Sequence, residues 1–279
     1  MSLKEYTEAL LARYHLTPRR SLSQHFLIDP NILDRIVTTA QPAQHDHVVE
    51  IGAGTGVLTG RLASRARRVT AIEVDARLCR LLRQELNDQP NVDVVQADAL
   101  QVHWEQYQFS PRSVPVLGNL PYHITSPVLF RFSRMSWVRS LLVLVQREVA
   151  ARIVAHPGTR TRGLLSVWLQ YVGTPLKVIN VPPQAFIPAP AVGSTLVHIP
   201  LRPCIPPEEQ KVFLIMLRAA FSARRKMLRN TLASALALAR VDAVGLLDRA
   251  GIDSRRRAET LTVDEFRELS RLYRGTKGG

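Results

Sequence analysis

Cysteine is scarce in this sequence, and the placement of the few cysteines excludes most of the roles that they take together. Only Cys79 and Cys204 occur among 279 residues. They lie far apart and lack the spacing of metal ligands, so we expect no metal site. Both thiols are expected to be reduced, as in a cytoplasmic protein.

Long apolar runs are also missing. No run approaches the roughly 18–20 residues that a membrane-spanning helix needs. The first 16 residues mix charges into a helical pattern and lack the uninterrupted apolar core of a signal peptide. We therefore expect a cytoplasmic protein that has no membrane partner.

Acidic residues are few relative to basic ones. The chain has 23 Asp and Glu against 37 Lys and Arg, which gives a net charge of +14, and nearly all the basic residues are Arg. Guanidinium groups bind phosphates in a bidentate way that Lys cannot match. A nucleic-acid partner is therefore indicated. A GC-rich genome that prefers Arg codons is the alternative explanation.

Short apolar, β-branched runs alternate with segments of helical periodicity in the first part of the chain. This alternation predicts an α/β fold with a parallel, doubly wound sheet. Two later β-like segments, 176–181 and 193–199, are expected to pair antiparallel at the sheet edge. The five earlier strand candidates are residues 47–52, 68–74, 92–97, 113–118 and 140–146.

Proline-rich segments near residue 200 mark a domain boundary. Beyond Pro207 the chain turns helical, with one long helix expected over 208–239 and shorter ones at 242–249 and 263–274. The pattern predicts two domains, 1–202 and 203–279. The second has a net charge of +6 on 77 residues, against +8 on the first 202, so its positive charge is denser.

A glycine-rich loop follows the first of these strands. Gly52, Gly54 and Gly56 stand between a strand and a helix, where glycine lets the backbone turn sharply and approach a ligand. The dinucleotide fingerprint would need a glycine at Val57 instead. With Glu50 ahead of the loop, the segment resembles motif I of S-adenosylmethionine-dependent methyltransferases. An ordinary tight turn is the alternative.

Acidic residues follow the next two strands. Glu73 ends the second strand, where a carboxylate can accept hydrogen bonds from ribose hydroxyls. Asp75 is a rival for this role, but it precedes a helical segment and is expected to cap it. Asp98 follows the third strand and could accept from the amine of adenine, or could cap a helix. We expect Glu73 and Asp98 at one edge of the sheet.

The segment Gly118–Thr125, GNLPYHIT, carries the most specific pattern. Asn119, Leu120, Pro121 and Tyr122 resemble the N-[LI]-P-[YF] tetrad of methyltransferases that modify exocyclic amines. The N6 lone pair of adenine is delocalised, so acceptors such as the Asn119 carbonyl and the Leu120 backbone carbonyl would localise it. Pro121 has no N–H to compete, and Tyr122 offers a face for base stacking. A turn with a surface Tyr is the alternative.

The segment 23–37 resembles the G-Q-N-F-L-x-D segment that precedes motif I in ribosomal RNA adenine N6-dimethyltransferases. Gln24 and Leu27 match this segment, whereas His25 stands where Asn is common. In that family the segment folds over the cofactor, which implies that His25 and Leu27 contact it. An ordinary loop before a helix capped by Asp29 or Asn31 is the alternative.

Further segments extend this resemblance along nearly the whole chain. Residues 144–155, 185–195, 220–232 and 261–273 are similar to segments of the same family. The resemblance implies a Rossmann-like class I methyltransferase domain over 1–202 and a helical RNA-contacting domain over 203–279. It also implies S-adenosylmethionine as donor, with its ribose at Glu73, its adenine near Asp98, and Gly52, Gly54 and Asn119 among its contacts.

The resemblance is to the small-subunit branch of the family. It implies that N6,N6-dimethyladenosine is made at two adjacent adenosines near the 3′ end of 16S rRNA, on an immature small ribosomal subunit, and a monomeric enzyme is expected. Two alternatives stay open. One is a 23S rRNA methyltransferase that confers macrolide-type resistance. The other is a non-catalytic rRNA-binding assembly factor.

A basic cluster lies in the expected long helix. Arg224, Arg225, Lys226 and Arg229 would span roughly 200° of a helix surface at 100° per residue. We expect these residues to contact RNA phosphates beside the catalytic pocket. The alternative is a solvated helix face.

Overall fold

The structure, a computed structural model, describes residues 1–121, 124–203 and 205–276. The chain divides into two compact units. The first comprises Met1–Ala150 and Leu176–Leu201, and the second comprises Ala151–Pro175 and the chain from Arg202 onward. No helix among the described residues is both long and apolar enough to cross a membrane.

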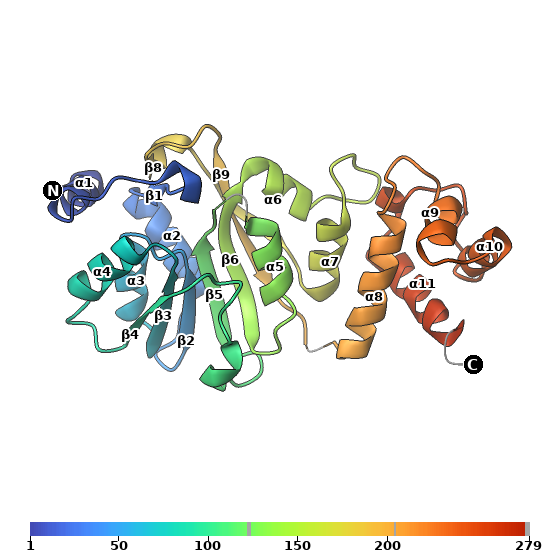
Figure 1. The fold of residues 1–279 in the computed structure, drawn as a ribbon, viewed down its shortest axis with the longest axis horizontal. Helices are drawn as coiled ribbons and strands as arrows, with labels where there is room; N and C mark the ends of the chain where they lie inside the picture. Colours follow the sequence, from blue (N-terminus) through green and yellow to red (C-terminus); the bar gives the residue numbers. More distant parts are fainter. Residues whose placement is uncertain (122–123, 204, 277–279) are drawn as a thin grey trace. The chain divides into compact units, whose positions relative to one another are not determined.

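The first unit is built on a seven-stranded sheet of order β4-β3-β2-β5-β6-β9-β7 (Figure 1). Strands β2 to β6 run parallel, and β9 lies antiparallel between β6 and β7. This confirms the expected doubly wound sheet with an antiparallel pair at one edge. The strands are β2 (His47–Ile51), β3 (Arg68–Glu73), β4 (Val92–Gln96), β5 (Val114–Asn119), β6 (Val138–Gln146), β7 (Leu176–Val181) and β9 (Ser194–Pro200).

Helices follow the strands of the first unit as the apolar periodicity predicts. Helix α2 begins after Asp29, whose carboxylate accepts from the backbone N–H groups of Asn31 and Ile32, and its apolar face packs on the sheet. The helices are α1 (Leu3–Arg13), α2 (Pro30–Ala40), α3 (Val57–Ala63), α4 (Ala76–Glu85), α5 (Thr125–Phe132) and α6 (Arg147–Ile153), with 3-10 turns η1 (Arg20–Leu22), η2 (Trp104–Tyr107) and η3 (Pro183–Ala185).

A second, two-stranded sheet joins distant segments of the first unit. Strand β1 (Phe26–Leu27) pairs antiparallel with β8 (Phe186–Ile187). The Leu27 and Phe186 side chains are buried in the cluster that also holds the apolar face of α2. This pairing fixes the segment before α2, for which the sequence predicted no strand.

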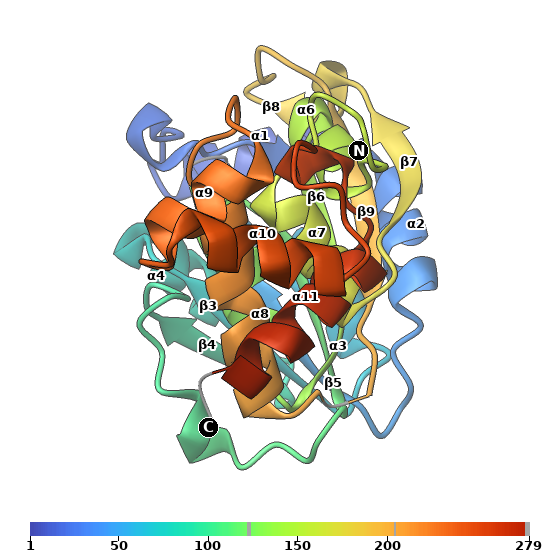
Figure 2. The ribbon, with the colours of Figure 1, turned by 90° about the vertical axis from the view of Figure 1, so that its right-hand side faces the viewer.

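The second unit is helical in its described part (Figure 2, where α7 is yellow-green and the helices from α8 onward are orange to red). Its core is aromatic: the Tyr171 and Phe213 rings stack with centroids 3.7 Å apart, and Phe266 packs against Phe213 and Phe221. Its helices are α7 (Leu164–Val172), α8 (Pro207–Ala220), α9 (Leu228–Ala235), α10 (Arg240–Arg249) and α11 (Val263–Thr276), with the 3-10 turn η4 (Ala258–Thr260).

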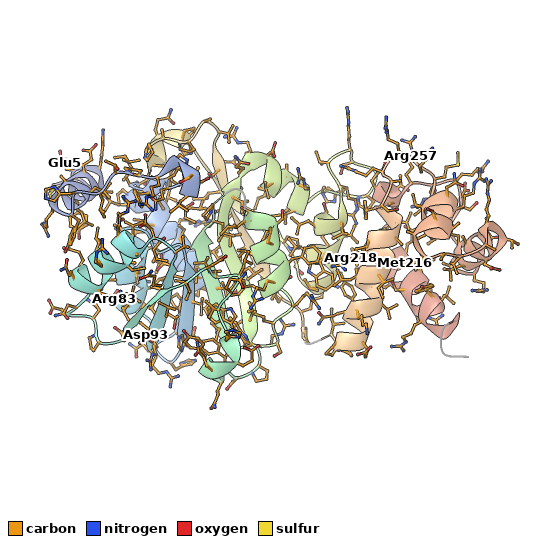
Figure 3. All side chains as sticks on the ribbon, in the orientation of Figure 1. Glu5, Arg83, Asp93, Met216, Arg218 and Arg257 are labelled. Carbon is orange, nitrogen blue, oxygen red and sulfur yellow. The ribbon has the colours of Figure 1, made fainter. Side chains whose placement is uncertain are left out.

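Helix α8 shows why this unit folds as a bundle. Met216 is fully buried in the unit, whereas Arg218, two positions further on, is exposed to solvent (Figure 3). Apolar residues at helical spacing therefore face the aromatic core, and charged residues cover the outer face.

The division into units differs from the single boundary expected after residue 202. Segment 151–175, which contains α7, belongs to the second unit. Helix α7 is apolar on nearly all sides and packs against α8 and α11. The proline-rich segment therefore marks only the last of three crossings between the units. The first two could not be predicted, because burial of α7 depends on helices that follow much later in the chain.

The long helix expected over 208–239 is wrong. Helix α8 ends at Ala220, and α9 starts only at Leu228. The first backbone N–H groups of α9 donate to distant carbonyls, from Leu228 to Arg256 and from Arg229 to Ser254. These bonds satisfy the unpaired donors of a new helix start, so tertiary contacts override the local helical pattern.

Candidate functional site

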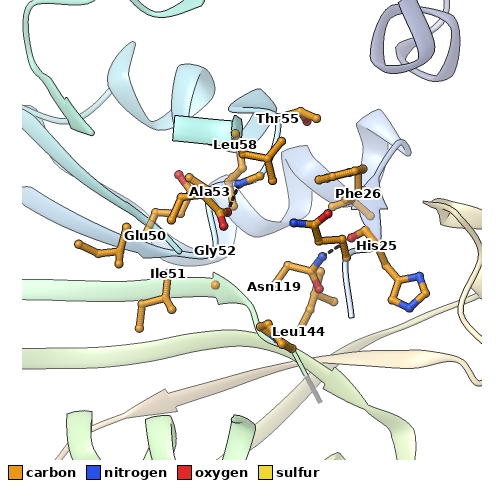
Figure 4. Close-up of a pocket in the computed structure, with 18 of the residues that line it drawn as sticks. His25, Phe26, Glu50, Ile51, Gly52, Ala53, Thr55, Leu58, Asn119 and Leu144 are labelled. Atoms are coloured by element: carbon orange, nitrogen blue, oxygen red, sulfur yellow. Dashed lines mark hydrogen bonds between the residues drawn. The ribbon is translucent and has the colours of Figure 1, made fainter. Parts of the chain in front are cut away.

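A cavity lies in the first unit at the carboxyl ends of β2, β3 and β5 (Figure 4). The chain order of the strands reverses here, because β3 flanks β2 on one side and β5 on the other. Sheets of this type bind ligands at such a switch point. The cavity is therefore where the fold itself predicts a site.

The strand register places two of the expected site residues, Glu73 and Asn119, at the same height along the sheet. Glu50 pairs with one residue of β3 and one of β5, and Glu73 and Asn119 each lie two residues beyond those partners. Side chains two residues apart point to the same face of a sheet. At this level β2 has already ended and the chain turns away at Gly52. The Glu73 and Asn119 side chains thus flank the gap that the glycine loop leaves.

The glycine loop needs its glycines for two reasons. Gly52 and Gly54 have φ angles of +76° and +59°, which L side chains rarely adopt. In addition, a Cβ atom on Gly54 would lie 3.1 Å from the Phe26 ring. The loop is therefore held close against the segment that contains β1.

The Glu73 carboxylate accepts three backbone hydrogen bonds, which the sequence did not predict. Its Oε1 accepts from the backbone N–H groups of Val74 and Asp75, each at 2.9 Å, and its Oε2 accepts from Gly54 N–H at 3.0 Å. Burial raises the pKa of this carboxyl, and these N–H groups oppose the rise. Because each oxygen has two acceptor positions, one position on Oε2 remains. Glu73 can thus accept one ribose hydroxyl rather than two.

The other two acidic residues after the strands differ in role: one caps a helix and the other lies at the cavity. Asp75 is the N-cap of α4 and accepts from Arg77 N–H at 3.0 Å, as expected. Asp98 is exposed at the cavity, and its Oδ1 accepts from Leu100 N–H at 2.9 Å in a turn. No α-helix begins there, so the capping alternative is wrong and the second carboxylate oxygen of Asp98 has no hydrogen-bond partner among the described residues.

Asn119 lines the cavity with a fixed carboxamide. Its Nδ2 donates to the His25 backbone carbonyl at 2.8 Å, which is the dashed line between these residues in Figure 4. A carbonyl can only accept, so this bond sets which end of the amide is nitrogen. The Oδ1 atom then accepts from none of the described residues and is left for a ligand.

The rest of the expected tetrad continues from β5. Leu120 is buried, and its N–H donates to the Leu144 carbonyl at 3.3 Å. Pro121 lines the cavity, and its carbonyl accepts from Ile124 N–H at 3.1 Å at the start of α5. Tyr122 lies outside the described residues.

The segment ahead of α2 closes one side of the cavity. His25 and Leu27 both line it, and their contact with the cofactor stays a prediction. The His25 ring, however, points away from the Asn119 contact in Figure 4, and its Nδ1 lies 2.6 Å from the Pro188 carbonyl. That nitrogen must carry the proton, since a carbonyl cannot donate. His25 therefore meets Asn119 through its backbone.

Two further residues line the cavity: Glu50, which was expected only as part of the glycine-loop motif, and Val74, for which no role was expected. Glu50 is 2% exposed and accepts from the Thr59 hydroxyl at 2.7 Å. Burial, with a smaller contribution from Glu73, raises the pKa of Glu50 to about 8. Val74 lines the cavity with an exposed apolar side chain. An apolar residue directly after a strand-ending Glu was the available signal for Val74.

Replacement of Glu50 by Gln should change the pH dependence of stability. A carboxyl with a pKa of about 8 in the fold and an ordinary value of about 4.3 when unfolded takes up a proton on folding. Stability of the natural chain should therefore fall as pH rises between these values, by up to about 1.4 kcal/mol per pH unit. In thermal melts from pH 5 to 8.5, the melting temperature of Glu50→Gln should increase relative to that of the natural chain as pH rises. If melting temperature depended on pH in the same way for both proteins, Glu50 could not be protonated in the fold.

No cluster of three or more His, Cys, Asp or Glu in the described ranges could hold a metal ion.

The basic residues of the second unit do not share one helix face, contrary to expectation. Arg224, Arg225 and Lys226 lie in the turn between α8 and α9, and Arg229 lies in the first turn of α9. The Arg224 guanidinium donates to the backbone carbonyls of Arg160, at 2.8 Å, and Arg162, at 2.9 Å. Arg224, Arg225 and Lys226 are all exposed, but the Arg224 guanidinium is bound to the neighbouring loop.

Three comparisons with known proteins agree with this geometry. A family model described as "Ribosomal RNA adenine dimethylase" matches residues 15–273. Two relatives are described as "Ribosomal RNA small subunit methyltransferase A". The one from Alkaliphilus oremlandii is 37% identical over 277 residues, covering 97% of this chain and 96% of the relative. The one from Pelotomaculum thermopropionicum is 40% identical over 274 residues, covering 94% and 93%.

Solved structures give the same result. A dimethyladenosine transferase from Plasmodium falciparum matches with a TM-score of 0.76 at 25% identity, over 91% of this chain and 98% of that one. The 23S rRNA methyltransferase ErmE matches with a TM-score of 0.68 at 27% identity, over 88% and 98%. These matches confirm the Rossmann-like methyltransferase fold and the family resemblance seen in the sequence. The chain belongs to the ribosomal RNA adenine dimethylase family.

Proposed function

We propose that this chain transfers methyl groups from S-adenosylmethionine to N6 of two adjacent adenosines near the 3′ end of 16S rRNA. The product is N6,N6-dimethyladenosine, made during small-subunit biogenesis. The observation that carries the proposal is the Asn119 carboxamide, whose nitrogen is held by the His25 carbonyl and whose oxygen is left at the cavity.

The residues at the cavity fit S-adenosylmethionine. Glu73 has one acceptor position for a ribose hydroxyl, and the exposed Asp98 carboxylate can accept from an adenine amine. The apolar Val74 and Ala99 side chains line the cavity at this end and suit a flat ring. The Glu73 and Asp98 carboxylates also match a cofactor of net positive charge, whereas burial keeps Glu50 protonated.

When bound, S-adenosylmethionine supplies an electrophilic methyl group. The protein's part is to hold the target amine. In the first transfer the Asn119 Oδ1 accepts one N6 hydrogen and the Leu120 backbone carbonyl accepts the other, which localises the nitrogen lone pair for attack. Before the second transfer N6 has only one hydrogen, and one of these two acceptors holds it. No strong general base is needed at this step, because the proton leaves only after the nitrogen has become cationic. The contribution is orientation and electrostatics, and Tyr122 is assigned the stacking of the base.

The small subunit is favoured over the large as the substrate. The curated relatives at 37% and 40% identity carry the small-subunit description, whereas the 23S rRNA methyltransferase ErmE is 27% identical. Primer extension on both ribosomal RNAs from a strain that lacks this chain should show unmethylated adenosines near the 3′ end of 16S rRNA. Loss of a mark in 23S rRNA alone would support the rival substrate.

A non-catalytic assembly factor is the other alternative. Such a factor would not need the free Asn119 Oδ1 beside a site for the cofactor, and both features are intact. Methyl transfer from labelled cofactor to under-methylated small subunits separates the two. Binding to subunits without transfer would favour the assembly factor.

The second unit is proposed to contact RNA. Arg225 and Lys226 are exposed in the turn after α8, and Arg257 is exposed in the segment that hydrogen-bonds to the start of α9. The methyl-transfer role, expected for 1–202, is proposed for the first unit, and the RNA-contacting role, expected for 203–279, is proposed for the second unit, which includes segment 151–175. A monomer remains the expected state.

Charge removal at Arg225 and Lys226 tests this surface. The double change Arg225→Ala/Lys226→Ala should weaken RNA binding and lower the salt slope of log K by about 1.4–1.8 for two lost phosphate contacts. Cofactor affinity should stay the same. Filter binding across a salt series measures the RNA affinity and its salt slope. The matched control is Lys4→Ala/Arg80→Ala, which removes two exposed charges of the first unit. An unchanged slope would remove these residues from the interface.

A further inference from the structure

A strap of residues 22–27, named here for its place along the cavity wall, is held at two points by side-chain hydrogen bonds. One point lies at the ribose end of the cavity and the other at Asn119. The strap is short, so a shift at one point moves the other. The attachment of the strap therefore affects the position of Asn119 as well as that of the residues at the ribose end of the cavity.

The first attachment is made by the Gln24 side chain. Its Nε2 donates to Asp75 Oδ2 at 3.1 Å, while its Oε1 accepts from Arg19 N–H at 2.8 Å. Asp75 is 4% exposed, and the Arg77 guanidinium lowers its pKa, so it is a fixed carboxylate acceptor. The Asp75 N–H in turn donates to Glu73 Oε1 at 2.9 Å. Gln24 thus ties the strap to the turn that presents Glu73.

The second attachment is made by the very next residue. The His25 carbonyl accepts from Asn119 Nδ2 at 2.8 Å. This contact alone distinguishes the two ends of the carboxamide among the described residues. Rotation by half a turn would replace the acceptor Oδ1 by an NH2 donor, and a donor cannot accept the hydrogens of an amine. The orientation of Asn119 therefore depends on where the strap places one carbonyl.

We propose that Gln24 is a positioning residue for methyl transfer: it holds the strap where the His25 carbonyl turns the Asn119 oxygen toward the target amine. The inference rests on the proposed function, because it gives Asn119 its role on the substrate. It assigns to Gln24 an effect on the transfer step that a residue which merely lines the cofactor cavity would not have.

The test measures single-turnover methyl transfer to under-methylated small subunits at saturating cofactor. Gln24→Ala removes the attachment, and Gln24→Glu keeps the shape but loses the donor beside Asp75. Both should slow transfer by about ten-fold to a hundred-fold, the range expected for a misplaced reacting group. Gln84→Ala, an exposed Gln on α4, is the matched control and should transfer at the natural rate.

A double-mutant cycle shows whether Gln24 acts through Asn119. In an Asn119→Ala background, Gln24→Ala should add no further loss, because the group that it positions is gone. Hydrogen exchange of the peptide that covers residues 20–28 should be faster in Gln24→Ala than in the control. Both results support the proposal, and neither depends on comparing affinities.

Three outcomes would overturn it. Unchanged transfer by both Gln24 variants, with only cofactor affinity reduced, would make Gln24 a cavity-lining residue. Fully additive losses in the double mutant would mean that Gln24 acts independently of Asn119. Natural transfer by Asn119→Ala alone would remove the proposed function of Asn119 and this inference with it, whereas the first two outcomes leave the proposed function intact.

Discussion

Replacement of Asn119 by Ala should reduce methyl transfer at saturating cofactor by about 10²–10³-fold, the cost of removing one preorganised polar group from a reacting centre. The variant lacks the Oδ1 acceptor for the target amine, so the nitrogen lone pair stays delocalised. Asn119 also lines the cavity that is proposed to hold the cofactor, which is why the rate must be measured with the cofactor saturating. Labelled cofactor and single-turnover conditions give this rate directly.

The Asn119→Ala experiment has a matched control in Asn87→Ala. Asn87 is exposed in the connection between α4 and β4, away from the cavity wall. Its replacement should leave the rate unchanged. Equal rates for both variants would show that no carboxamide is needed for transfer, and the catalytic role assigned to Asn119 would be lost.

Replacement of Glu73 by Ala should weaken cofactor binding by about a hundred-fold and leave RNA binding intact. The change removes the proposed ribose acceptor and the partner of the Gly54, Val74 and Asp75 N–H groups. The Asp75 N–H is buried, and leaving it unsatisfied costs about 1–3 kcal/mol. The loop would then no longer be preorganised. Calorimetric titration with the demethylated cofactor measures the affinity.

Glu73→Gln separates the two parts of this effect. Gln keeps the shape but turns an NH2 group toward one set of backbone N–H donors, so it should lose affinity as well, although less than Ala. If Glu73→Gln bound the cofactor at the natural affinity, the acceptor role assigned to the Glu73 carboxylate would be contradicted. Equal loss of cofactor and RNA binding in Glu73→Ala would show instead that the residue supports the fold as a whole.

The sheet could be predicted because its information is local. Each strand run is apolar and β-branched, and Glu73 and Asn119 end strands that the sequence already marks. Parallel order then requires their side chains to meet at one edge. The glycine loop is similarly local, since positive φ angles at Gly52 and Gly54 are a property of the turn itself.

The features that could not be predicted depend on contacts between distant residues. The break after Ala220 follows from bonds between the start of α9 and segment 254–256. The Gln24 contact with Asp75 spans 51 residues, and the His25 contact with Asn119 spans 94. No pattern of spacing or propensity reports such pairs. The His25 contact sets the orientation of Asn119, on which the proposed chemistry depends.

The most direct measurement is nucleoside analysis by mass spectrometry after the purified protein acts on under-methylated small subunits with S-adenosylmethionine. The account predicts N6,N6-dimethyladenosine at two adjacent positions near the 3′ end of 16S rRNA, formed by the natural chain and nearly absent with Asn119→Ala. Formation of no methylated adenosine, or of one methylated at a ring nitrogen, would contradict it.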